Sequence, residues 1–428
     1  MRESSAIGRL LLAATLTAAG AGVGGMALAM LLHAIQHLAY HYSLSHVVSH
    51  QSFLSGVEGA TPLRRLMAAI GAGVVAGVGW YALYRYGRPL VSVKRAVDEG
   101  APMPLGSTIV HALLQIVTVA LGSPLGREVA PREVGALIGT RLAAVFALPA
   151  EQRTWIVAAG AGAGLAAVYG VPLAGAVFTL EVLLGTFNPS AAALALFMST
   201  LAALIASLGL GSDVQYVIPA LPHDHWLTVW ALVSGPIFGV AGFAFRRATA
   251  AVRAQTPRGV WLPVLCMLSF TALGLLSMRF PELPGNGKGS VQLGFQGEMA
   301  LGMACTLLAL KVAVICASLR AGAMGGLLTP GLACGALLAI VCSALWNAAL
   351  PSVSASACAV VGGAAFLATS MRMPLTAIVL VAEFTDLPYA LGPAVLLAVA
   401  GSVCAERICN WEGGSLFRCW KREPLRRP

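Results

Sequence analysis

Charged residues are scarce in this chain. Only 10% of its 428 residues are Asp, Glu, Lys or Arg, 58% are hydrophobic, and the mean hydropathy is +0.82. A soluble domain carries about a quarter charged residues, so this composition excludes a soluble globular protein and indicates an integral membrane protein. The formal net charge of +10 comes without any basic run interleaved with aromatic residues, which argues against nucleic acid as a partner.

Cysteine is absent from the first half of the chain. The nine cysteines lie between Cys266 and Cys419, mostly inside apolar segments, and no two of them form a CxxC pair. Such a pattern favours small buried side chains over disulfide bridges or metal ligands.

Acidic residues are also missing from a histidine cluster near the end of the first long apolar segment. His33, His37 and His41 are spaced by four residues, followed by His46 and His50, and no HExxH motif follows. Stacked imidazoles could hold a metal, which would suit an intramembrane metalloenzyme. A polar cap where a helix leaves the bilayer explains the cluster with fewer assumptions. We therefore predict no metal site, no cofactor and no enzyme activity.

Apolar stretches separated by Gly, Pro or charged residues run from about residue 7 to residue 403. A helix needs about 20 apolar residues to cross a bilayer, and several stretches are shorter. They are predicted to be half-crossing helices inside the protein, where broken helices line a cavity or a site. Basic residues flank the first stretch, a link in the middle of the chain and the last stretch, so both termini and that link are predicted to be cytoplasmic. These residues are Arg2, Arg9, Arg246, Arg247, Arg253, Arg258, Arg418, Lys421, Arg422, Arg426 and Arg427.

One short motif places a carboxylate at membrane depth. Gly126-Arg127-Glu128-Val129-Ala130-Pro131 lies between apolar segments that are nearly free of charge. Ionisable groups in such a position are expected to face protein or a water-filled path, and to be functional. A surface loop in which Arg127 and Glu128 pair in water would be the alternative in a soluble protein.

An internal repeat relates two halves of the chain, predicted as residues 1–215 and 216–428. Gly126 precedes Pro131 by five residues, as Gly325 precedes Pro330. Pro172 precedes Glu181 by nine residues, as Pro374 precedes Glu383. An odd number of crossings in each half would make the halves antiparallel, and would bring helix N-termini to the midplane from both sides. Helix N-termini bind anions through free N–H groups and a partial positive charge.

These motifs resemble those of the CLC family of chloride channels and proton-coupled anion antiporters, over nearly the whole chain. The resemblance implies an all-α polytopic membrane protein, an inverted repeat with broken, half-spanning helices, and a homodimer in lipid with one anion pathway per subunit. It also implies a bacterial plasma membrane. The chain ends at Pro428, so we expect no cytoplasmic regulatory domain.

The same resemblance implies roles for individual residues. Glu128 corresponds to the gating glutamate, which couples protons to the anion. The implied anion-binding residues lie in the two motifs, in a loop that begins at Gly87, and near the chain end: Gly126, Arg127, Val129, Gly326, Leu327, Leu328, Thr329, Gly87, Arg88, Pro89 and Phe417. The roles of Glu181 and Glu383 stay open between a place beside the pathway and a structural contact.

Departures from the family pattern bear on the anion. The first loop has no serine, Leu328 replaces a phenylalanine, and Phe417 aligns roughly with a tyrosine, so the hydroxyls of a chloride site are missing. GREVAPREVGA with a GGxxTP motif is similar to the fluoride-exporting branch, and Thr329 offers a hydroxyl to a small anion. We predict a fluoride/proton antiporter. The alternative is a chloride/proton antiporter or a passive chloride channel, which Val182 would permit because antiporters often keep a proton-relay glutamate there.

Overall fold

The computed structural model describes residues 2–42, 52–219, 224–257, 259–297 and 299–410. Within these ranges the chain is α-helical, and its only β-type pairing is an isolated bridge between two glycines. The α-helices are α1 Arg2–Tyr40, α2 Phe53–Gly59, α3 Pro62–Tyr86, α4 Val93–Asp98, α5 Leu105–Ala120, α6 Val129–Val145, α7 Ala150–Tyr169, α8 Pro172–Phe178, α9 Pro189–Leu210, α10 His225–Ala254, α11 Trp261–Arg279, α12 Lys288–Gln296, α13 Leu301–Ala321, α14 Leu328–Asn347, α15 Ala355–Ser370, α16 Pro374–Thr385 and α17 Gly392–Asn410.

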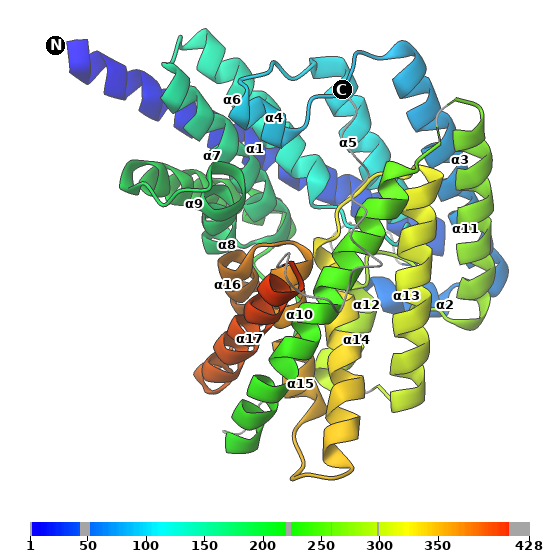
Figure 1. Cartoon of the computed structure of the whole chain (residues 1–428). Helices are drawn as coiled ribbons and strands as arrows, with labels where there is room; N and C mark the ends of the chain where they lie inside the picture. Colours follow the sequence, from blue (N-terminus) through cyan, green and yellow to red (C-terminus); the bar gives the residue numbers. More distant parts are fainter. Residues whose placement is uncertain (1, 43–51, 220–223, 258, 298, 411–428) are drawn as a thin grey trace.

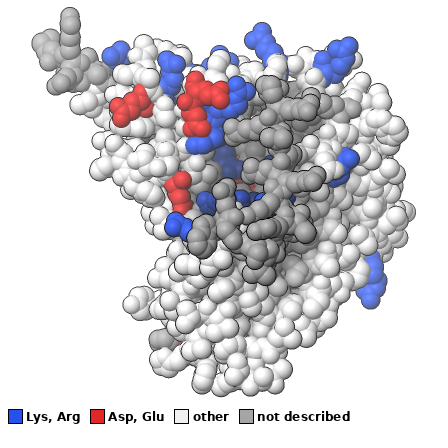
Figure 2. Space-filling view, in the orientation of Figure 1, with Lys and Arg blue, Asp and Glu red and all other residues white. Residues whose placement is uncertain are grey.

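The predicted membrane fold is confirmed. Eight of the described helices are long and apolar enough to cross a bilayer, and four shorter apolar helices lie among them. In Figure 1, α10, α13 and α14 run side by side through the lower half, while α1 crosses obliquely behind α6 and α7. Most Lys and Arg residues on this face gather in its upper part, and its lower part is mostly free of charge (Figure 2).

Small residues let several helix pairs approach closely. α6 packs along α7, α10 along α17, and α14 along α15. A Cβ added at Gly135 of α6 would overlap the carbonyl of Gly160 in α7. Interfaces between membrane helices favour small residues because lipid provides no hydrophobic drive, so dispersion contacts between close backbones must hold the helices together.

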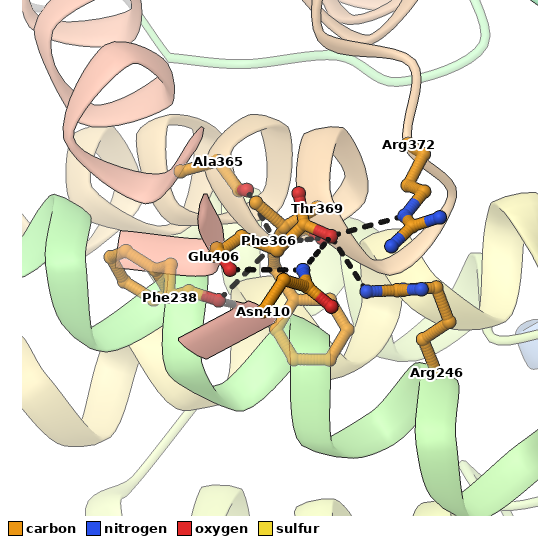
Figure 3. A network of polar contacts seen from close by, with 8 residues as sticks. All are labelled: Phe238, Arg246, Ala365, Phe366, Thr369, Arg372, Glu406 and Asn410. Carbon is orange, nitrogen blue, oxygen red and sulfur yellow. Dashed lines mark hydrogen bonds and ion pairs between the residues drawn. The ribbon is translucent and has the colours of Figure 1, made fainter. Parts of the chain in front are cut away.

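A buried carboxylate ties three elements together near the end of α17. Glu406 accepts hydrogen bonds from Arg246 of α10 at 2.6 Å and from Arg372 at 3.1 Å, and Asn410 donates to it at 3.0 Å (Figure 3). Arg372 lies in the link between α15 and α16. Two cations compensate one carboxylate here, and removing the carboxylate would leave both arginines without their acidic partner.

The two short helices that begin at Pro172 and Pro374 cap each other. Glu383, near the end of α16, accepts from the backbone N–H groups of Leu173 and Ala174 at 2.9 and 2.7 Å. Glu181, in the π-helical turn after α8, accepts from Leu375 and Thr376 of α16 at 2.9 and 2.7 Å. Each glutamate thus satisfies the free N–H groups that open the other helix. The equal spacing from proline to glutamate in the two halves accounts for this mutual capping. The boundary of the two halves between residues 215 and 216 stays a prediction.

Candidate anion site

The two glycine-containing motifs meet in space. The N–H of Gly126 donates to the carbonyl of Gly326 at 2.7 Å, and the N–H of Gly326 donates to Gly126 at 2.9 Å. A helix begins just after each glycine: α6 at Val129, directly after Glu128, and α14 at Leu328, directly after Leu327. The first turns of two helices therefore open at one place, where free N–H groups favour a negative charge.

The Glu128 side chain occupies that place. Its carboxylate is fully buried, and Oε1 accepts a hydrogen bond from the N–H of Leu328 at 2.8 Å. A Cβ added at Gly126 or at Gly326 would overlap the carboxylate, so both positions must lack a side chain. The residue does not pair with Arg127 in a surface loop. It is an anionic group bound by a helix N-terminus.

Two hydroxyls line the same place. Tyr169, the last residue of α7, donates to Oε2 of Glu128 at 3.3 Å, and its oxygen lies 3.0 Å from Oγ1 of Thr329. The sequence analysis predicted Thr329 but missed Tyr169. The sequence feature that could have indicated Tyr169 is a tyrosine at the end of a glycine- and alanine-rich segment, just before Val171-Pro172. Its partner Glu128 lies 41 positions earlier in the chain.

Arg127 lies beside the carboxylate and faces a cavity. Its side chain is 8% exposed, its guanidinium carbon is 5.1 Å from the centre of the Tyr169 ring, and its Nε finds no hydrogen-bond partner among the described residues. The cavity holds about 470 Å³ and is also lined by His33, Lys288 and Asp213. Two cations at its inner end favour entry of an anion.

A second cavity, of about 780 Å³, shares no lining residue with the first. Tyr84 of α3, Arg253 of α10 and Met324 line it, and Met324 directly precedes the second glycine motif. Arg253 donates to the carbonyl of Gly325 at 3.4 Å. Arg127, next to Glu128 in the chain, thus lines the first cavity, and Met324, next to the second glycine motif, lines the other.

The remaining predicted site residues fall into three groups. Gly126, Val129, Gly326, Leu327 and Leu328 lie at the two helix starts. The loop of Gly87, Arg88 and Pro89 is exposed; the Arg88 N–H donates to Ser107 at 2.8 Å, and the nearest neighbours of Gly87 are Leu83 and Ser107 rather than Glu128. Phe417 lies outside the described residues.

The histidines of the predicted cluster have different surroundings in the structure. His33 lines the cavity beside Arg127, and the His37 ring lies 4.2 Å from the Tyr42 ring, centre to centre. His46 and His50 lie outside the described residues. Within the part of the chain that is described, no three His, Cys, Asp or Glu side chains are placed to hold a metal ion.

Known proteins are similar to this chain over most of its length. The family model described as "Voltage gated chloride channel" matches residues 71–407. The chain is 30% identical over 364 residues to a "Putative chloride channel protein ClcB-like" from Ralstonia nicotianae, covering 80% of this chain and 82% of the relative. It is 28% identical over 418 residues to the "H(+)/Cl(-) exchange transporter ClcA" of Cronobacter sakazakii, covering 93% and 86%.

Two solved structures share the fold. A slow cyanobacterial Cl⁻/H⁺ antiporter superposes with a TM-score of 0.79 at 20% identity, covering 93% of this chain and 94% of that one. A CLC-type fluoride/proton antiporter superposes with a TM-score of 0.67 at 21% identity, covering 93% and 96%.

Proposed function

The chain belongs to the voltage-gated chloride channel (CLC) family, and from that premise we propose that it exchanges a halide for protons, with Glu128 as both gate and proton carrier. The observation that carries the proposal is the hydrogen bond from the Leu328 N–H to the buried carboxylate of Glu128. A side chain that is itself an anion fills a site built for an anion.

This arrangement links the two transported species. As a carboxylate, Glu128 competes with a halide for the N–H groups of α14. As a neutral acid it loses the charge that these groups favour, so its affinity for the helix end falls and the halide takes its place. Arg127 attracts the anion to the site without binding it directly, because a full charge in contact would slow its release.

Proteoliposomes test the role of Glu128. Under a chloride gradient, we expect the parent protein to move protons against the chloride flow, and Glu128→Gln to keep chloride efflux while proton movement stops. Glu151→Gln, which alters an exposed carboxylate in the first turn of α7, is the matched control. Unchanged proton movement in Glu128→Gln would remove Glu128 from this role.

We propose chloride as the exchanged anion. The fluoride prediction relied on hydroxyls missing from the first loop and the chain end, on the spelling of the motifs and on the Thr329 hydroxyl. The Tyr169 hydroxyl, which that prediction did not include, lies beside Thr329 and supports a site with donors for a larger anion. The relatives quoted above carry chloride in their names, including a proton exchanger similar over 93% of this chain.

Fluoride is the second candidate, and the spelling of the two motifs favours it. The first loop lacks a serine, and the Arg88 N–H is engaged by Ser107, so the loop offers a large anion few donors. Vesicles loaded with equal fluoride and chloride, read with an electrode for each ion, separate the two. One good hydrogen bond, about 1.4 kcal/mol, changes the ratio roughly tenfold. Chloride efflux that clearly exceeds fluoride efflux is the result expected, and fluoride-dominated efflux would overturn the chloride assignment.

We further propose a homodimer in the plasma membrane of a bacterium, with both termini cytoplasmic. α9 carries a stretch rich in Ala and Ser, as close helix packing prefers, and exposes Leu196, Phe197 and Leu204 beside the exposed Leu173 of α8. Chemical cross-linking in mild detergent should give a dimer. Monomer alone at every protein concentration would contradict this proposal.

A further inference from the structure

A polar stripe runs along α5 inside the membrane domain. Thr108, His111 and Gln115 recur at spacings of three and four residues, which puts them on one face of the helix, and all three side chains are buried. α5 packs against α3, α6 and α1. Polar groups at this depth are costly, and they persist where they pair with one another or serve a path for ions or protons.

His111 faces a carboxylate on α6. Its Nδ1 lies 2.8 Å from Oε2 of Glu133, and Nε2 of Gln115 lies 3.1 Å from the same oxygen and 3.0 Å from Nδ1. A protonated Nδ1 would donate to the carboxylate, and a neutral Glu133 acid would donate to a bare Nδ1. The same heavy-atom positions thus suit a proton on either residue.

Three buried polar atoms around this pair have no partner in the described ranges. They are Nε2 of His111, Oε1 of Gln115 and Nε1 of Trp80. The Trp80 ring stands edge to face with the imidazole, at 6.2 Å between centres. A buried donor or acceptor without a partner is destabilising, and water is the partner that buried polar sites usually take.

Glu133 relates the pair to the second cavity through Tyr84, and to Glu128 through their positions in the chain. Tyr84, one turn beyond Trp80 on α3, lines that cavity with Arg253 and interacts electrostatically with Glu133, as Arg132 of α6 does. Glu133 follows Glu128 by five residues on α6, about 7.5 Å along the helix axis.

Apolar side chains of α1 also pack against α5: Leu28 and Leu32 share a buried cluster with Ala112 and Ile116. Tyr84 and Arg132 interact electrostatically with Glu133, and Arg253 interacts with Tyr84.

We propose that His111 and Glu133 form a second protonatable site, which takes protons from the cavity beside Tyr84 and exchanges them with Glu128. The inference rests on the proposed proton-coupled function. Nε2 of neutral His111 accepts a proton from water, and the Nδ1 proton passes to Glu133, which breaks an N–H bond and forms an O–H bond. Glu133 then gives this proton through water to the Glu128 carboxylate. Loss of the Nε2 proton to water and uptake of a proton from water at Nδ1 restore His111, so that one proton leaves the cavity water for each proton that reaches Glu128.

Parallel proton and chloride recordings from proteoliposomes test the site. We expect Glu133→Gln and His111→Gln to lower proton flux at least about tenfold, a modest loss for a positioned proton-transfer group. Chloride efflux should fall with it, because Glu128 then stays a carboxylate in the anion position. Added to Glu128→Gln, neither substitution should change chloride efflux. Glu151→Gln should change neither flux. If Glu133→Gln and His111→Gln keep full proton flux while Glu128→Gln moves no protons, the second protonatable site is overturned and the role of Glu128 is not. A parent protein that moves no protons would overturn the proposed coupling as well.

Infrared difference spectra between acidic and alkaline pH provide a readout that does not need transport. The protonated-carboxyl band of Glu133 should remain in Glu128→Gln and be lost from the spectrum of Glu133→Gln, where the band of Glu128 stays. It should shift in His111→Gln because the hydrogen-bond partner changes. His111→Gln also serves if Glu133→Gln does not fold. A band that is identical in the parent, Glu133→Gln and His111→Gln would show that the pair only holds α5 to α6.

Discussion

Tyr169 supplies a hydroxyl where the sequence predicts that hydroxyls are missing. It lies within hydrogen-bond distance of both Glu128 and Thr329. Because a halide in the place of the Glu128 carboxylate would accept the same hydroxyl hydrogen bond, we expect Tyr169→Phe in the Glu128→Gln background to weaken halide binding about tenfold, the effect of roughly 1.4 kcal/mol from one hydrogen bond. Halide titration by calorimetry measures this.

Tyr216→Phe is the matched control for that substitution. Tyr216 is also buried and belongs to the same aromatic group around Phe384, but no hydrogen bond links it to Glu128. Equal losses in the two variants would assign the effect to packing rather than to the Tyr169 hydroxyl.

Lys288 predicts a pH dependence of anion entry. It lies on α12, outside the eight spanning helices, and lines the cavity with Arg127. Burial, with a smaller effect from Arg127, lowers its pKa from 10.5 to about 8. The charge is therefore present below about pH 8 and is lost as the pH rises through that value, so anion entry from this cavity should weaken between pH 7 and 9.

That dependence is best measured in the Glu128→Gln background, where the gate itself no longer titrates. Lys288→Gln should make chloride flux low and flat across this pH range, and Lys288→Arg should keep it high and flat. A parent-like pH profile in Lys288→Gln would show that the lysine does not attract the anion.

Among single residues, the sequence pointed to Glu128 because a carboxylate between apolar segments is rare. Gly326 and Leu328 were named from the resemblance of a short contiguous motif, and the structure places them next to Glu128. Tyr169, His111 and Glu133 could not, since their partners lie on other helices and only the fold brings them together. Gly87, Arg88 and Pro89 were assigned to the anion site by resemblance alone. In the structure the Arg88 N–H donates to Ser107 instead.

At the scale of helices, the mutual capping of α8 and α16 bears on the roles of Glu181 and Glu383, which the repeat left open between the pathway and a structural contact. The spacing from proline to glutamate predicts that Glu181 and Glu383 are related, but it does not reveal that each binds the helix of the other half. A carboxylate bonded to two backbone N–H groups is structural, which explains why both halves keep it at the same distance from the proline.

We expect Glu383→Gln and Glu181→Gln each to destabilise the protein by about 1–2 kcal/mol, because a neutral amide oxygen replaces a charge-assisted acceptor at a helix start. Thermal unfolding in detergent measures the loss, with Glu151→Gln as control. If Glu181→Gln keeps the parent stability but changes the pH dependence of transport, its role is in the pathway instead.

At the scale of the whole molecule, composition and segment length were sufficient for the membrane fold, because sparse charge and short apolar stretches follow directly from lipid burial. Orientation depends on where the loops lie. The ends of α3 and α10 point to the upper part of Figure 1, where Lys and Arg gather in Figure 2, and the link between α14 and α15 lies at the bottom. The basic side should be cytoplasmic by the positive-inside rule.

Tags on the two sides test this orientation. A green fluorescent protein fused before Met1 should fluoresce, because it folds in the cytoplasm, and an epitope inserted before Ser352 in the link from α14 to α15 should bind antibody on intact spheroplasts. A second epitope, in the exposed Arg88 loop near the end of α3, should bind only after the membrane is opened. The reverse labelling pattern would show the opposite membrane orientation, in which the cavity at Arg127 and Lys288 faces the cytoplasm. Protons would then reach His111 from outside the cell, which makes orientation the measurement that sets the direction of exchange.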